Sequence, residues 1–206
     1  MAYVGLDLPD SLPTAVKTVI RGCVEPLFQD VHYMLATTIL ELAGDGPRRQ
    51  LQVPIAHILL AAVAGFSTSL CSAQGATGVR FTNCLTSFYP WDVDPPTGIS
   101  KEDASSALYN TFRNPLVHYL GTHKNGGDNT MVRIVQIFRG TSDAEARIEE
   151  LERFSIKPYS EPCLVVTEHK TTLWLDPLYW GVRKLVERWA RDASEVSQAN
   201  IRFTRA

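Results

Sequence analysis

The sequence lacks most of the short motifs that identify an enzyme class. It contains no phosphate-binding loop, no G-x-S-x-G nucleophile elbow, no dinucleotide-binding glycine pattern and no H-E-x-x-H pair. Their absence leaves no signature of a P-loop nucleotidase, an elbow-type serine hydrolase, a nicotinamide-dependent oxidoreductase or a zinc protease. Internal repeats and low-complexity tracts are also missing, so a repeat architecture is not expected.

Cysteine is scarce, and none of the four residues forms a C-x-x-C pair. A disulfide framework or a structural zinc site is therefore not expected. Cys23, Cys71, Cys84 and Cys163 are interpreted as small buried hydrophobic residues in a reducing cytoplasm.

Positive charge is not in excess, because 20 Lys and Arg residues face 22 Asp and Glu residues and the formal net charge is −2. This balance argues against tight nonspecific RNA binding, although an enzyme needs only a local cationic cleft. The first ten residues contain no basic region followed by an apolar one, so we expect no signal peptide and a cytoplasmic location. Residues 53–73 form a long apolar stretch, but Pro54 and His57 favour a core helix over a membrane span.

Hydrophobic spacing predicts a mainly α protein, with one domain over residues 1–206 and an up-and-down helical bundle. Ser11 is expected to cap the first helix, and Pro26 to interrupt or kink it. Ser100 and Asp103 resemble a capping box at a later helix. The predicted helices cover about residues 13–24, 27–42, 51–72, 81–88, 101–112, 142–154 and 176–189.

A small antiparallel β insertion, about residues 131–175, is expected before the last helix. Residues 131–138 are rich in Val and Ile and predict a strand, with a helix as the alternative. Residues 163–167 and 171–175 flank Glu168-His169-Lys170 and predict a β-hairpin.

Asp176-Pro177 is expected to begin the last helix. The cations of that helix are predicted to lie on a solvated face, and a phosphate-tracking surface is the alternative. These cations are Arg183, Lys184, Arg188 and Arg191.

The stretch Arg113-Asn114-Pro115-Leu116-Val117-His118 concentrates chemistry in about two helical turns. Arg113 is a permanent cation whose planar fork suits phosphate, and His118 can take or give a proton near neutral pH. The two side chains together could cleave a phosphodiester without a metal, since the cation offsets developing charge while the imidazole moves the proton.

This hexapeptide has the form R-N-x-x-x-H, preceded by Leu108-Tyr109, and it resembles the signature motif of the HEPN superfamily. The resemblance implies a helical, commonly dimeric protein. Many members of that family are metal-independent ribonucleases, and others are inactive binding modules.

The resemblance further implies that Arg113, Asn114 and His118 are the catalytic residues, brought together from two protomers. His118 would act as base on a ribose 2′-hydroxyl or as acid on the leaving 5′-oxygen, giving a 2′,3′-cyclic phosphate and a 5′-hydroxyl. Candidate substrate-binding residues are Tyr109, one turn before Arg113, and His123 and Lys124. No cofactor is expected.

Two alternatives remain. The first is a noncatalytic HEPN-like module that binds a nucleotide, an RNA or a protein such as an antitoxin, in a toxin–antitoxin, phage-defence or stress system. The second is a metal site at His118 and His123 with Glu168 and His169, although a five-residue step does not align two imidazoles on a helix. We therefore predict no metal.

Pro115 predicts a break in the helix, because proline removes a hydrogen bond and disfavours an α conformation at the residue before it. Asn114 would then cap a second short helix, with Pro115 at its first position. Arg113 would lie at the break, beside a helix N-terminus that favours anions.

Overall fold

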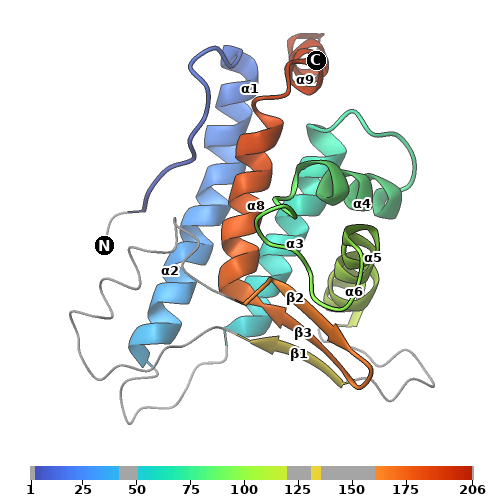
Figure 1. The fold of residues 1–206 in the computed structure, drawn as a ribbon. Coiled ribbons are helices and arrows are strands. Elements are labelled where there is room, and N and C mark those ends of the chain that lie inside the picture. Colours follow the sequence, from blue (N-terminus) through green and yellow to red (C-terminus); the bar gives the residue numbers. More distant parts are fainter. Residues whose placement is uncertain (1–2, 42–50, 120–130, 136–160, 206) are drawn as a thin grey trace.

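The computed structural model describes the backbone of residues 3–41, 51–119, 131–135 and 161–205. Within the helices, the side chains of residues 36–41, 117–119 and 205 fall outside this description. The described part is mainly helical, with a small sheet at one end of the helices (Figure 1). The predicted fold class is therefore confirmed at the level of a mainly α protein with a small β element. The helix expected at 142–154 lies outside the described residues.

Three long helical segments form the body of the protein and lie side by side in Figure 1. The first is continuous through α1 (Thr14–Val19), the π-helical turn η1 (Ile20–Val24) and α2 (Glu25–Glu41). The others are α3 (Gln52–Ser69) and α8 (Leu175–Trp189). Their shared core is apolar, and its largest fully buried members include Phe28, Ile20, Leu35, Ile55, Leu59, Leu60, Tyr179 and Trp189.

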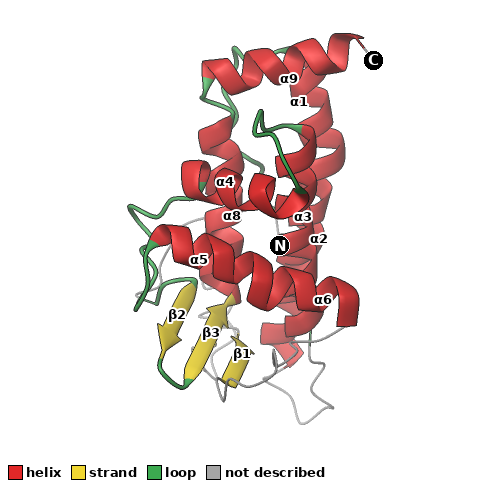
Figure 2. Cartoon of the chain, turned by 90° about the vertical axis from the view of Figure 1, so that its right-hand side faces the viewer, coloured by secondary structure: helices red, strands yellow, loops and turns green. Residues whose placement is uncertain are grey.

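Shorter helices pack across this body. They are α4 (Thr77–Phe88) and a continuous segment made of α5 (Lys101–Ala107), the π-helical turn η2 (Leu108–Arg113) and α6 (Asn114–Tyr119). Figure 2 shows the α5–α6 segment crossing the long helices, and α9 (Ala193–Arg205) lying across their far end. The predicted up-and-down arrangement is therefore only partly met. Helix α8 runs parallel to α3, because the C-terminal ends of both helices lie together beside α9, and the shorter helices cross the long ones.

The sheet has the strand order β1-β3-β2. The hairpin β2 (Leu164–Thr167) and β3 (Lys170–Trp174) is antiparallel, as predicted. However, β1 (Met131–Val135) pairs in parallel with β3, so the prediction of a purely antiparallel insertion is wrong. Parallel pairing needs a long connection, and the chain between β1 and β2 is long enough to supply it.

Helix α8 is not the last helix, and its cations do not all lie on a solvated face. It is buried on nearly every side, including Arg183 and Glu187, so the solvated-face prediction is wrong for Arg183. Two other cations of the predicted set, Arg188 and Arg191, are exposed and form ion pairs with Asp92 and Asp7. The prediction failed at Arg183 because the N-terminal segment covers that face.

The N-terminal segment before α1 has no regular structure, and side chains of the helices bind its backbone instead. Arg183 donates hydrogen bonds to the carbonyls of Val4 and Gly5, at 2.7 and 3.1 Å. The amide of Leu6 donates to Glu25, and that of Asp7 to Glu187. Backbone N–H and C=O groups that are removed from water need hydrogen-bond partners, and here charged side chains of the helices provide them.

The two prolines expected to break helices instead follow π-helical turns. The residue before Pro26, Glu25, donates its amide to the carbonyl of Ile20, and the residue before Pro115, Asn114, donates to Tyr109. Both bonds span five residues rather than four. The extra residue widens the turn at the place where a proline ring would clash with the preceding carbonyl.

The predicted break at Asn114 is therefore wrong. Asn114 has helical dihedrals, with φ −65° and ψ −50°, so it does not cap a second helix. Ser11 also makes no cap, because α1 has Pro13 at its N-cap and no side-chain hydrogen bond there. At α5, by contrast, the Ser100 hydroxyl accepts the amide of Asp103 at 3.1 Å, which confirms the predicted cap.

Among the described helices, α3 alone is long and apolar enough to cross a membrane. Half of that stretch is buried against the rest of the protein. A core helix of a globular bundle has the same composition, so the length and hydropathy of α3 are weak evidence for a membrane span.

We predict that His32 makes stability fall in mild acid. Burial and the nearby Arg183 lower the pKa of His32 below its ordinary value of 6.5, so the folded protein resists a proton that the unfolded chain accepts. Stability is therefore lost as pH drops below about 6.5. For this one group, the loss reaches at most about 1.4 kcal/mol at pH 5.5.

The measurement is the free energy of unfolding by denaturant at pH 7.5 and 5.5, for the wild type and His32→Gln. The loss between the two pH values should be smaller in the variant, which carries no titratable group at this position. An equal loss in both proteins would refute the assignment to His32.

Candidate functional site

The structure places the predicted catalytic segment on one continuous helix. Tyr109 and Arg113 belong to η2, Asn114 begins α6, and the backbone of His118 lies one turn further along α6. The side chain of His118 is outside the described residues, as are His123 and Lys124 entirely. The geometry of the candidate site can therefore be built from Tyr109, Arg113 and Asn114.

Arg113 is half-buried and held by two neighbours from its own helix. Its guanidinium carbon lies 5.4 Å from the centre of the Tyr109 ring, within cation–π distance. Its Nη1 donates a long hydrogen bond of 3.4 Å to Oδ1 of Asn114. Its Nε is buried, and no hydrogen-bond acceptor for it lies in the described part of the chain.

Tyr109 is held in turn by α4. Its ring packs against Phe81, with 5.3 Å between the centroids. Gly78 lies so close that a Cβ atom there would be 2.8 Å from Cε1 of Tyr109. Helix α4 therefore fixes the ring on which the Arg113 guanidinium rests, and the lack of a side chain at Gly78 makes the close approach possible.

Arg113 differs from several other arginines in its electrostatic environment. Arg21, Arg188 and Arg191 each form an ion pair of 2.6 Å with a carboxylate. Arg113 has no carboxylate within ion-pair distance among the residues that the structure describes. An aromatic face and an amide oxygen hold a guanidinium without neutralising its charge, so Arg113 can still bind an anion.

A second buried polar cluster is structural. Tyr89 donates a 2.7 Å hydrogen bond to Asp94, and Asp94 accepts the amide of Cys163. Burial raises the pKa of Tyr89 well above its ordinary range, and the Asp94 charge adds to this effect. The cluster ties the loop after α4 to the start of β2. A phenol that keeps its proton in this way has no evident role as an acid or base at neutral pH.

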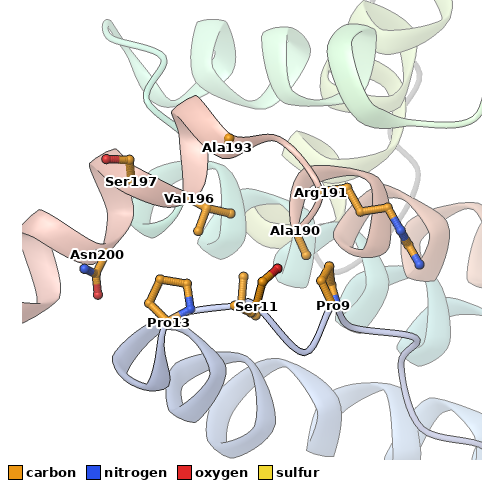
Figure 3. Close-up of a pocket in the computed structure, with 10 residues that line it drawn as sticks. Pro9, Ser11, Pro13, Ala190, Arg191, Ala193, Val196, Ser197 and Asn200 are labelled. Carbon is orange, nitrogen blue, oxygen red and sulfur yellow. The ribbon is translucent and has the colours of Figure 1, made fainter.

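Two surface cavities lie in other parts of the fold. One, of about 470 Å³, separates the N-terminal segment from α9 (Figure 3). The N-terminal segment lines one side of it with Pro9, Ser11 and Pro13, and the facing side includes Val196, Ser197 and Asn200 of α9. The other, of about 610 Å³, lies beside Trp91 and the Arg188–Asp92 ion pair. Neither cavity is lined by a predicted catalytic residue.

No group of three or more His, Cys, Asp or Glu side chains that could hold a metal occurs among the described residues.

Comparison with protein-family models, with curated proteins and with solved structures finds no match.

Sequence reasoning identified Tyr109 beside Arg113 but missed the contribution of α4. The four-residue step on a helix gave the first pair, because such residues share a face. Gly78 and Phe81 lie about thirty residues earlier, and no local pattern relates them to Tyr109.

We predict that Gly78→Ala displaces the Tyr109 ring and destabilises the protein by about 1–2 kcal/mol, because the new Cβ would overlap the ring. Gly65→Ala is the matched control, since nothing lies within 4 Å of a Cβ built at that helical position. The control should be neutral or stabilising by up to about 1 kcal/mol. Denaturant unfolding measures both changes, and equal effects would contradict the close packing of Gly78 on Tyr109.

Proposed function

We propose that this protein is a metal-independent endoribonuclease of the HEPN type. The observation that carries the proposal is the state of Arg113, a half-buried guanidinium that an aromatic ring and an amide hold, with no carboxylate partner among the described residues. Its charge is thus left for an external anion, and a phosphodiester is the anion for which its planar fork is best shaped.

The chemistry follows from the order of residues along this helix. Arg113 would bind the scissile phosphate and offset the charge that grows on its oxygens in the transition state. His118, one turn further along, would take the proton of the ribose 2′-hydroxyl or protonate the leaving 5′-oxygen. Asn114 would orient the guanidinium through the hydrogen bond that it already accepts. The products are a 2′,3′-cyclic phosphate and a 5′-hydroxyl.

We further propose a homodimer in which the Arg113–His118 segments of two protomers face each other. This arrangement would double the local positive charge where the two segments meet, although the chain carries a net charge of −2. Size-exclusion chromatography with light scattering tests the dimer independently of activity.

The second candidate is a noncatalytic HEPN-like module, and the absence of excess positive charge favours it. In that case, Arg113 would bind a nucleotide, an RNA end or an acidic segment of a partner protein, such as an antitoxin, without cleavage.

We predict that purified protein cleaves a labelled structured RNA in excess chelator, and that Arg113→Ala lowers the rate by about 10²–10³-fold. His118→Ala should lower it by about 10²–10⁴-fold. Arg113→Lys keeps the charge but loses the fork, so it should recover only part of the rate. Product ends are identified by mass spectrometry.

Arg188→Ala is the matched control, because it removes an exposed cation that already has a carboxylate partner. It should cleave like the wild type. A DNA strand of the same sequence should resist cleavage, since it lacks the 2′-hydroxyl. Cleavage of DNA at the RNA rate would exclude this mechanism, and Arg113-dependent binding without cleavage would support the noncatalytic module.

A further inference from the structure

Two of the four cysteines lie against each other in the core. Cys71 follows the C-terminal end of α3, Cys84 lies on α4, and their Sγ atoms share a hydrogen bond at 3.2 Å. Both side chains are buried and both thiols are free. The sulfur atoms of a disulfide are about 2.05 Å apart, so a further approach of about 1 Å would join these two.

Helix α9 is hydrogen-bonded to the chain beside this pair, at the end of α3. Arg202 donates hydrogen bonds to the carbonyls of Leu70 and Cys71, at 2.7 and 3.2 Å. Glu195, two turns earlier on α9, accepts the amide of Ser72 at 2.6 Å and also its hydroxyl. These bonds satisfy backbone groups that the end of α3 would otherwise leave open. Cys71, at the end of the bonded stretch, is buried.

We propose that Cys71 and Cys84 form an intramolecular disulfide on exposure to hydrogen peroxide, and that α9 controls access to them. In the first step, the Cys71 sulfur takes one oxygen of the peroxide, giving a sulfenic acid and one water molecule. In the second, the Cys84 sulfur attacks the sulfenic sulfur, the S–S bond forms, and a second water leaves. Two thiols are oxidised by two electrons and one peroxide is reduced to two waters.

The environment assigns these roles to the two cysteines. The hydrogen bond with Cys71, burial and the Glu195 carboxylate all raise the pKa of the Cys84 thiol well above its ordinary value. Thiolates attack peroxides and thiols do not, so Cys84 is poorly suited to the first step. We therefore assign the first step to Cys71, whose backbone carbonyl accepts a hydrogen bond from Arg202 of α9.

The disulfide would tie α4 to the end of α3. Because α4 also carries Gly78 and Phe81, which pack on Tyr109, the bond would restrain the helix beside Arg113. Formation of this disulfide does not depend on the proposed ribonuclease activity. It follows from the distance between the two sulfur atoms and from the hydrogen bonds of α9 beside them.

The test treats the folded full-length protein with hydrogen peroxide, in a Cys23→Ser background that removes the exposed thiol. Peptide mass mapping without reduction should find one cross-link, between Cys71 and Cys84, with the loss of two hydrogens. Cys84→Ser should form no cross-link and should leave Cys71 as a sulfenic acid, trapped by dimedone. Cys163, which is buried elsewhere, should stay unoxidised.

The role of α9 is tested by Glu195→Ala and Arg202→Ala, either of which removes hydrogen bonds to the end of α3. Each should speed disulfide formation by roughly threefold or more, because lost hydrogen bonds favour local opening of the cover. Arg191→Ala is the matched control, since Arg191 binds Asp7 and not α3, and its rate should equal that of the wild type.

Two results would overturn the proposal. One is a folded protein in which peroxide modifies neither cysteine, or modifies Cys71 without ever forming the cross-link. The other is cross-linking at the rate of global unfolding in the wild type and in both α9 variants, which would show that α9 does not control access.

Discussion

The burial of one charged side chain, Arg183 on α8, organises the rest of the fold. A guanidinium is costly to remove from water unless it is hydrogen-bonded, and Arg183 donates to Tyr179 and to two backbone carbonyls of the N-terminal segment. Tyr179 in turn donates to the carbonyl of Phe28 on α2. The segment, α2 and α8 are thus joined through one cation, and the aromatic rings of Tyr3 and Tyr179 pack on it.

A second constraint is the way this chain accommodates proline in a helix. Pro26 and Pro115 lie at the same position after a π-helical turn, and in both places the preceding amide bonds to a carbonyl five residues back. One extra residue in the turn keeps the helix continuous. The consequence for the candidate site is that Tyr109, Arg113 and the backbone of His118 share one helix, where a break would have separated them.

Helix α4 connects the two places where we propose chemistry. One part of it packs Gly78 and Phe81 on Tyr109, and a later turn places Cys84 against Cys71. Neither contact is visible in the sequence, because each joins α4 to a different element. A helix of twelve residues therefore positions both the ring beneath Arg113 and one of the two paired thiols.

The sequence alone determined the elements whose signals are local. Hydrophobic spacing located α2, α3 and α8, the alternating runs around Glu168-His169-Lys170 located the hairpin, and Ser100 marked the start of α5, because each pattern depends on residues a few positions apart. Only the tertiary structure decided the burial of Arg183, the parallel pairing of β1, the π-helical turns before the prolines and the meeting of Cys71 with Cys84. The buried arginine, the strand pairing and the cysteine contact depend on partners distant in the sequence, and periodicity carries no information about such partners. The π-helical turns are local, but the hydrophobic pattern does not distinguish a five-residue bond from a four-residue one.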